Sequence, residues 1–581
     1  MTYIEKISSP NDIKDLPFNE LTTLAQEIRD AILNRDSLIG GHVGPNLGIV
    51  EVAIALHKVF NSPTDKIVWD VSHQCYPHKI LTGRQAGFLT EQGMKDISGY
   101  TNQDESEHDH FKIGHTSTAV SLATGLAKAR DLKGENHNVI AILGDGSLSG
   151  GEALEGLSNA AVLNSNIIII LNDNEMSIAE NHGGLYTNLR ALRNTNGNAP
   201  DNLFKALGFE YHYAPDGNNL EEMLHLFEKV KGTNHPTLLH IHTKKGKGYS
   251  FAEENKERWH WSVPFNIKDG ESKFNFEGEN YNDITYNFLS KKIKEDNSVV
   301  IVNAGTPGVF GLTPDRRQEL GKNYVDVGIA EEHAVAFSSA LAKGGCKPVF
   351  MVMSSFIQRT YDQLSQDLAL NQNPAVILVA WGGISGADMT HLCTFDIPLI
   401  SNIPNIVYLA PQTKEEYLSM LDWALEQKEH PVVIRMPKEV ISTPYEPFNY
   451  ARLNTYQVQE MGDTVAIIAA GSFYQLGKEV SSLLKEKGIT PTLINPRYLT
   501  GVDEALLTQL KEKHQLVITL EDGELDGGFG EKIARFYGSS NIKTLCFGAQ
   551  KEFTDRVPLD ELYKRYHLTP TQIVDDILKT L

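Results

Sequence analysis

Short apolar runs alternate with helical patterns of apolar and polar positions along the first part of the chain. Each run ends in small or polar residues, which is typical of strands buried on both faces of a parallel sheet. Strands are predicted at 67–71, 139–143, 167–171 and 237–242. From about residue 20 to residue 245, the pattern therefore predicts a parallel α/β domain.

The same alternation returns after a polar segment. Residues 262–280 contain Pro264, Gly270 and Gly278, which favours a linker, and we place it at 266–280. Further strands are predicted at 299–303, 325–328, 348–353, 375–380 and 432–435, and then at 464–470, 492–495 and 516–521. The predicted fold class is α/β, with parallel sheets flanked by helices. It comprises three domains, at 1–265, 281–445 and 446–581, of which the C-terminal one is the smallest.

Charge and composition restrict the partners of the chain. Its 581 residues carry a net charge of −21, so we expect no nucleic-acid or anionic-membrane partner, because both require clustered Lys and Arg. There is no apolar stretch of about 18 residues and no apolar signal segment, so we expect neither export nor membrane insertion. Cys75, Cys346, Cys393 and Cys546 form no Cys-x-x-Cys pair, which favours a cytoplasmic location.

The turn after the second predicted strand carries an acidic residue where an anion would otherwise bind. Gly146 and Ser147 offer backbone N–H groups to a phosphate, whereas Asp145 places a negative charge in the same turn. A divalent cation such as Mg²⁺ resolves this conflict, because protein oxygens and two phosphate oxygens can share its octahedral shell. The predicted metal ligands are Asp145, the side chain of Asn174 and the carbonyl of Met176.

Two other interpretations of this motif are weaker. A lone Gly-Asp-Gly is usually a tight turn beside a polar loop, but Asn174 follows the next predicted strand, so both polar groups should meet at one sheet edge. A dinucleotide-binding fold would require glycine at position 149, which is Ser149. The pairing therefore favours a diphosphate held through a metal.

In these motifs the chain resembles the thiamine-diphosphate enzymes, and among them the transketolase-like 1-deoxy-D-xylulose-5-phosphate synthase family. The resemblance extends over nearly the whole chain, and other transketolase-like enzymes lack the long segment around His73. The matching segments are Gly41-His42, 69–84, 114–118, 144–147, 244–249, 329–335 and 356–359. The resemblance implies the thiamine-diphosphate fold, with a diphosphate-binding domain, a pyrimidine-binding domain and a transketolase C-terminal domain, usually in a homodimer.

The resemblance also implies a reaction. The cofactors would be thiamine diphosphate and Mg²⁺, and pyruvate would be decarboxylated and joined to glyceraldehyde 3-phosphate. One alternative keeps the pyruvate chemistry but uses a different, unphosphorylated aldehyde. A second alternative is a non-catalytic paralogue that only binds cofactor. Intact Glu331, Asp145 and Asn174 argue against that paralogue, because mere binding does not require the activating acid.

Glu331 matches the acid that hydrogen-bonds the pyrimidine ring of the cofactor. It lies between a predicted strand end and a helix start, where burial would raise its pKa and keep the carboxyl a neutral donor. The structural alternative is a helix cap. Phe356 matches the aromatic residue on which the pyrimidine stacks, although an isolated Phe more often belongs to a core.

Other positions match residues that surround the cofactor in this family. The implied cofactor contacts are His73, Gly114, His115, Thr116, Gly146, Ser147, Asn174, Lys245 and Tyr249. The implied catalytic histidines are His42, His73, His260 and His391. Imidazole can donate hydrogen bonds and move protons near neutral pH, although any single histidine is more often structural or exposed. For Lys245, a solvated basic side chain is the alternative.

The implied substrate contacts are Arg359, Asp388 and Arg435. Departures from the family pattern concern the aldehyde acceptor. Pro45, Met353 and Trp381 stand where the family usually has Ser, Tyr and Arg. Because phosphate recognition relies on charge-assisted donors, Arg435 is the cation that we expect to remain for the acceptor phosphate.

Overall fold

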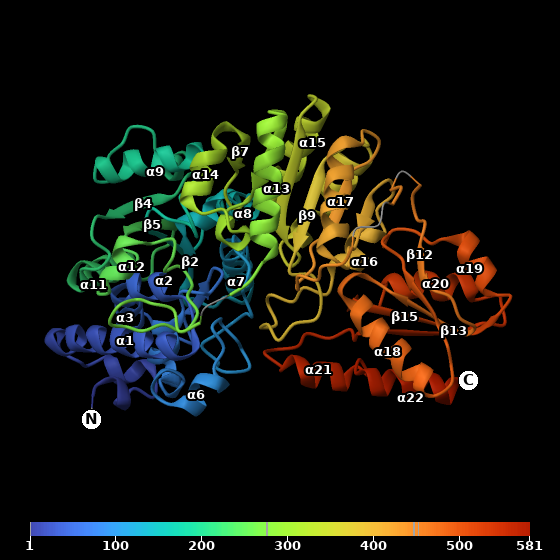
Figure 1. Ribbon diagram of the computed structural model, residues 1–581. Helices are drawn as coiled ribbons and strands as arrows, with labels where there is room; N and C mark the ends of the chain where they lie inside the picture. The colour runs from blue at the N-terminus through green and yellow to red at the C-terminus, as the bar shows by residue number, and fades with distance from the viewer. Residues whose placement is uncertain (1, 275–276, 445–447, 451) are drawn as a thin grey trace. The chain divides into compact units, whose positions relative to one another are not determined.

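The computed structural model describes residues 2–274, 277–444, 448–450 and 452–581 (Figure 1). The chain forms two compact units. The first comprises 1–277 with 328–330, and the second comprises 278–327 with 331–581. The division between residues 277 and 278 falls within the segment predicted as a linker, 266–280.

The first unit is built on a parallel sheet with the strand order β1-β2-β3-β5-β4. Its strands are β1 Lys66–Trp69, β2 Val139–Gly144, β3 Ile167–Asp173, β4 Glu210–Ala214 and β5 Pro236–His242. Its helices are α1 Phe18–Ile39, α2 Val43–Gly48, α3 Val50–Val59, α4 Tyr76–Lys79, α5 Ala86–Leu89, α6 Glu91–Asp96, α7 Ala119–Lys133, α8 Gly151–Ala160, α9 Gly184–Asn194, α10 Leu203–Leu207, α11 Leu220–Val230 and α12 Ser250–Glu254. The strands predicted in this region are confirmed. The edge strand β4 was not predicted, because its partly exposed, polar sequence lacks an apolar run.

Alternate residues of the central strands enter two different cores. Ile168 and Ile170 of β3 pack in a cluster with residues of α1, α3 and α11. Ile167 and Ile169 of the same strand pack in a second cluster with residues of α7, α8 and α9. Because successive side chains of a strand point to opposite faces, helices must cover both faces, which explains the unbroken apolar runs in the sequence.

The second unit contains two sheets. The first is parallel, with the order β10-β11-β9-β8-β6-β7, and the second has the order β12-β14-β13-β15-β16, in which β12 is antiparallel to β14. The strands are β6 Val299–Asn303, β7 Tyr324–Asp326, β8 Lys347–Met353, β9 Val376–Ala380, β10 Val407–Leu409, β11 Val432–Arg435, β12 Gln457–Glu460, β13 Thr464–Ala469, β14 Thr492–Asn495, β15 His514–Glu524 and β16 Lys543–Ala549. The predicted α/β class is confirmed, whereas β10, β12 and β16 were not predicted because they are short or lack continuous apolar runs.

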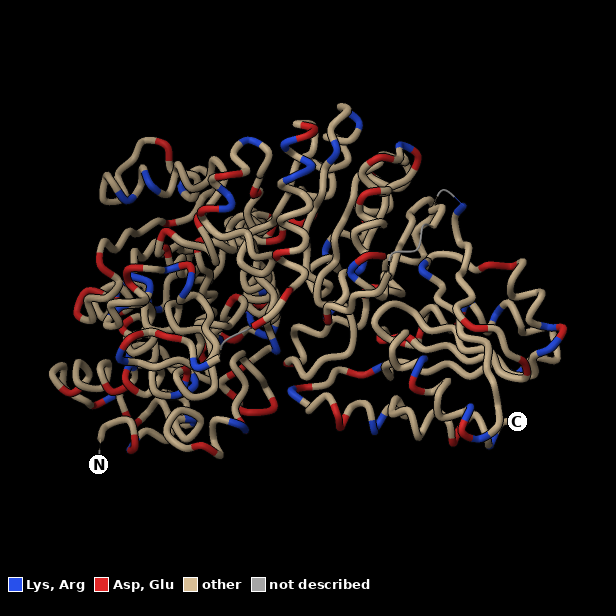
Figure 2. The backbone as a smooth tube through the Cα atoms, viewed as in Figure 1, with Lys and Arg blue, Asp and Glu red and all other residues tan. Residues whose placement is uncertain are grey.

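Acidic and basic residues are distributed along the backbone of both units (Figure 2). The helices of the second unit are α13 Tyr281–Glu295, α14 Pro314–Leu320, α15 Glu331–Lys343, α16 Asp396–Ser401, α17 Lys414–Glu426, α18 Tyr474–Glu486, α19 Glu504–Leu510, α20 Phe529–Tyr537, α21 Leu559–Arg565 and α22 Pro570–Thr580. Among the described residues, none of the helices of either unit has the length and apolarity needed to span a bilayer.

The carboxyl ends of the parallel strands position the chemically important residues. In the first unit, His73 follows β1, Asp145 follows β2 and Asn174 follows β3. In the second unit, Glu331 follows β7 and Phe356 follows β8. Parallel strands end at the same edge of a sheet, which is where open α/β sheets bind ligands.

Candidate active site

Asp145 begins a short 3₁₀ turn, Asp145–Ser149, between β2 and α8. Its carboxylate is buried and accepts a hydrogen bond from Asn181 Nδ2 at 2.8 Å. Burial and the nearby Asp173 carboxylate raise the pKa of Asp145. An ionised Asp145 therefore requires a cation beside it, which fits the predicted divalent metal.

Asn174 directly follows β3, and its Oδ1 accepts a hydrogen bond from the Met176 amide at 3.2 Å. The preceding residue, Asp173, is buried between His240 Nε2 at 2.8 Å and Arg193 Nη1 at 2.5 Å. Burial alone would raise the pKa of Asp173, but these two partners lower it to about 2. Sequence reasoning missed this network, because Arg193 and His240 come from two separate elements, α9 and β5.

Gly146 and Ser147 lie in a tightly packed part of the same turn. A Cβ atom on Gly146 would lie 2.7 Å from Ser177 Oγ, so a larger residue would not fit. Ser117 Oγ donates to the Ser147 carbonyl at 2.9 Å, and the Ser117 amide donates to Asp70 at 2.9 Å. Ser117 therefore connects the turn to the segment that follows the predicted contacts Gly114, His115 and Thr116.

Three of the predicted histidines form one cluster in the first unit. The ring centroids of His42 and His73 are 5.2 Å apart, those of His73 and His260 are 5.2 Å apart, and those of His42 and His260 are 5.7 Å apart. The Tyr100 ring lies edge-on to His42 at 5.8 Å. Residues that are far apart in the sequence thus provide a group of imidazoles that can exchange hydrogen bonds with one ligand.

Lys245 lies beside this cluster and is buried. Its Nζ donates to the Ser177 carbonyl at 2.6 Å and lies 3.1 Å from His260 Nδ1. Burial lowers the pKa of Lys245 to about 7. The alternative of a solvated basic side chain is therefore wrong. Burial and the Lys245 cation also hold the pKa of His260 well below its ordinary value, so His260 is neutral.

Tyr249 occupies an aromatic cluster with Phe251, Trp259 and Phe265. Its hydroxyl donates to the carbonyl of Ile267 at 3.1 Å. The structure thus gives Tyr249 a packing role, and its predicted contact with the cofactor stays a prediction.

In the second unit, Glu331 is the first residue of α15 and is buried. Burial raises the pKa of Glu331 to about 7, as predicted. Its Oε2 has no hydrogen-bond partner among the described residues, and Arg359 Nη1 lies 3.9 Å away. A buried carboxyl with an unsatisfied oxygen fits an acid that bonds a ring nitrogen of thiamine diphosphate.

Phe356 and His391 lie together in the same unit, with ring centroids 5.9 Å apart and an edge-on arrangement. His391 Nδ1 lies 3.4 Å from the Asp388 carboxylate. Burial would raise the pKa of Asp388, but His391 and Thr390 hold it below its ordinary value. Phe356, Asp388 and His391 were predicted separately, and the fold brings them together.

Arg435 forms part of a buried ion-pair network. Its Nε lies 2.6 Å from Asp396, and a second nitrogen pairs with Asp522. Tyr408 adds a hydrogen bond to Asp396 at 2.6 Å, and a Cβ atom on Gly382 would lie 2.6 Å from Arg435 Nε. Two carboxylates thus compensate the charge of Arg435, and its predicted contact with the substrate stays a prediction. Sequence reasoning missed these partners, because Asp396 and Asp522 are 39 and 87 positions from Arg435.

Family models match most of the chain. The N-terminal model of 1-deoxy-D-xylulose-5-phosphate synthase matches residues 4–200 and 193–243. The transketolase pyrimidine-binding model matches 280–443, and the transketolase C-terminal model matches 454–573. Among solved structures, a transketolase from Campylobacter jejuni is 18% identical, with a TM-score of 0.43, covering 97% of this chain and 100% of that one.

Curated relatives are similar over their full lengths. A protein of Caldanaerobacter subterraneus named 1-deoxy-D-xylulose-5-phosphate synthase is 38% identical, covering 99% of both chains. Proteins of the same name from Clostridium tetani and Alkaliphilus oremlandii are 36% and 37% identical. The alignments cover 100% and 99% of this chain respectively, and 99% of each relative.

Proposed function

The chain belongs to the 1-deoxy-D-xylulose-5-phosphate synthase family, and we propose that it joins pyruvate to glyceraldehyde 3-phosphate, giving 1-deoxy-D-xylulose 5-phosphate and carbon dioxide. It is a transketolase-like transferase that uses thiamine diphosphate with a divalent metal ion. Relatives that match over their full length are named 1-deoxy-D-xylulose-5-phosphate synthase. The alternative function with a different aldehyde acceptor is therefore not favoured. Bound thiamine diphosphate supplies the electron sink that allows pyruvate to lose carbon dioxide.

The observation that carries this proposal is the environment of Glu331. A carboxyl that is buried, unsatisfied at Oε2 and raised in pKa to about 7 keeps a substantial protonated fraction at neutral pH, and this fraction can act as a hydrogen-bond donor. In our proposal, Glu331 donates to the pyrimidine ring and Phe356 packs against that ring. Arg359 and Asp388 contact the substrate.

In the first unit, Asp145, the side chain of Asn174 and the Met176 carbonyl would hold the metal with the diphosphate. The buried Asp145 supports this assignment, because a divalent cation would compensate its charge. His42, His73 and His260 would bind the substrate carboxylate or hydroxyl groups and hold the protons that the reaction moves. His391 would take the same role in the second unit.

We further propose that the active protein is a homodimer, as the family resemblance implies. Sedimentation equilibrium of the protein with cofactor measures this directly. A mass of twice 64.5 kDa is expected, and a monomer at every concentration tested would contradict the proposal.

The product assay tests the reaction itself. The purified chain is mixed with thiamine diphosphate, Mg²⁺, pyruvate and a panel of phosphorylated and unphosphorylated aldehydes, and both carbon dioxide and the ketose product are measured. We expect the highest kcat/KM with glyceraldehyde 3-phosphate. Carbon dioxide release without any ketose from this acceptor would contradict the assignment.

A further inference from the structure

His42 and His73 reach the same cluster from separate segments. His42 precedes α2, whereas His73 follows β1 in a turn with unusual backbone angles. Val71 and Ser72 have φ values of 56° and 63°, a left-handed conformation that is unfavourable for these residues, above all for β-branched Val71. Such a turn persists only when the surrounding contacts fix it.

Asn46 contacts the backbones of both histidines. Its Nδ2 donates to the His42 carbonyl at 2.7 Å and to the His73 carbonyl at 2.7 Å. Its Oδ1 accepts a hydrogen bond from the Tyr76 amide at 2.9 Å, and the side chain is fully buried. The carboxamide of Asn46 provides two N–H donors and a carbonyl acceptor at the same time. Neither an Asp nor an Ala side chain at this position can reproduce this pattern.

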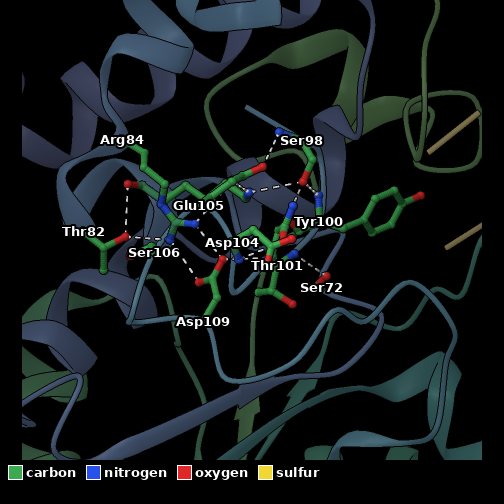
Figure 3. Close-up of polar contacts among 12 residues, drawn as sticks. Ser72, Thr82, Arg84, Ser98, Tyr100, Thr101, Asp104, Glu105, Ser106 and Asp109 are labelled. Atoms are coloured by element: carbon green, nitrogen blue, oxygen red, sulfur yellow. Dashed lines mark hydrogen bonds and ion pairs between the residues drawn. The ribbon is translucent and has the colours of Figure 1, made fainter. Parts of the chain in front are cut away.

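A second group of contacts holds the His73 turn through the neighbouring residue. Ser72 Oγ donates to the Ile113 carbonyl at 2.6 Å and accepts from the Thr101 amide at 2.8 Å. Figure 3 shows Ser72 and Thr101 in the same region as a buried ion pair between Arg84 and Asp109. In this ion pair, Arg84 Nη1 lies 2.6 Å from Asp109 Oδ2, and Arg84 Nη2 lies 3.0 Å from Asp109 Oδ1. The turn is thus fixed through Ser72 by the Ile113 carbonyl and the Thr101 amide, and through His73 by Asn46.

We propose that Asn46 is a positioning residue that sets the relative placement of His42 and His73 for the reaction. The inference rests on the proposed function, because that function gives the two histidines their role. Asn46 itself acts through the two backbones, so its loss should alter the geometry of the imidazoles without removing a group that binds metal or diphosphate.

Asn46→Asp is the main test, because it keeps the shape of the side chain but replaces both donors by acceptors. We expect kcat for the joining reaction to fall about a hundredfold, which is typical of a misplacement of about 1 Å. The affinity for thiamine diphosphate with Mg²⁺, measured by calorimetry, should stay within about threefold of the wild type. Asn46→Ala, which adds no charge, provides the second variant if the Asp variant does not fold.

Asn323 offers a matched control. It is also buried, and its Nδ2 donates to the carbonyls of Asn297 at 2.9 Å and Val299 at 2.8 Å. Asn323→Asp loses the same kind of bonds, so it should lower Tm without lowering kcat of the folded protein. A purely structural role of Asn46 predicts the same result for its variants, and that result would overturn the proposal.

Histidine ring signals give a readout that does not depend on turnover. In protein with ¹⁵N-labelled histidine, Asn46→Ala should shift the ring resonances of His42 and His73 but leave those of His391 unchanged. Unchanged His42 and His73 signals would reject the positioning role even in an active enzyme. A wild type that makes no ketose would instead reject the proposed function, while the ring shifts would still decide the role of Asn46.

Discussion

Lys245 Nζ lies 3.1 Å from His260 Nδ1, and the Lys245 side chain is buried. In its charged form Lys245 donates to Nδ1, so the ring proton of a neutral His260 is on Nε2. Burial lowers the pKa of Lys245 to about 7, which places its loss of charge within the working range of the site. The pair therefore couples the charge of Lys245 to the tautomer of a histidine in the cluster.

Lys245→Met removes this cation and keeps a long side chain. Because Lys245 helps to hold the pKa of His260 low, that pKa should rise in the variant. If neutral His260 is the active form, the acid limb of the pH profile of kcat/KM should move to higher pH by about one unit. Lys244→Met is the control, because the Lys244 side chain is 56% exposed and pairs with Glu253. Equal profiles for both variants would show that the 3.1 Å contact has no effect on catalysis.

Glu331→Gln should preserve cofactor binding and lose turnover, because the amide keeps the shape of the side chain but cannot transfer a proton. We expect kcat to fall by about 10²–10⁴-fold, the range of a positioned general acid. Calorimetry measures the cofactor affinity, the product assay measures kcat, and Glu332→Gln serves as the control. A Gln variant with wild-type kcat would assign the acid role to another residue.

The same substitution should change the pH dependence of stability in the cofactor-free protein. The folded pKa of Glu331, about 7, exceeds its ordinary value of 4.5, so the folded state binds more protons between these values. The contribution of Glu331 to the free energy of unfolding is therefore fully present below pH 4.5, and it is lost as the pH rises through 7. Glu331→Gln should raise the free energy of unfolding at pH 8 by about 3 kcal/mol and change it little at pH 4. Urea unfolding at both pH values measures the difference, and an equal effect at both would contradict this account.

Asp145→Asn should weaken the metal-dependent binding of thiamine diphosphate. The amide keeps an oxygen but loses the charge that attracts a divalent cation, so the affinity should fall by more than about tenfold. Calorimetry with and without Mg²⁺ measures this, and the exposed Asp201→Asn is the control. If Mg²⁺ improves cofactor binding by the same factor in Asp145→Asn as in the wild type, Asp145 is not a metal ligand.

Arg435→Met should destabilise the second unit, because it leaves the buried carboxylates of Asp396 and Asp522 without their cation. Breaking one partner of a buried ion pair typically costs about 3–5 kcal/mol. The triple variant that also carries Asp396→Asn and Asp522→Asn should recover most of this loss. Urea unfolding of the three proteins is the measurement, and a fully stable single variant would show that the network contributes little.

The sequence predicted the strands that carry most of the site. Residues 139–143 and 167–171 are unbroken apolar runs, and the structure buries them on both faces as β2 and β3. The placement of Asp145 and Asn174 followed, because parallel strands end at one edge of the sheet. The edge strand β4 was not found, because an exposed strand does not need an apolar run.

The sequence by itself determined the α/β class, the residues at the strand ends and the family resemblance, because these depend on local patterns and on motifs in the chain order. Only the tertiary structure decided which charges are satisfied. Arg435 is neutralised by Asp396 and Asp522, and Lys245 is buried beside His260. These partners are 15 to 87 positions apart in the sequence. Packing between distant segments decides whether a charged group is buried and which partners it has. No local pattern in the sequence can therefore predict either.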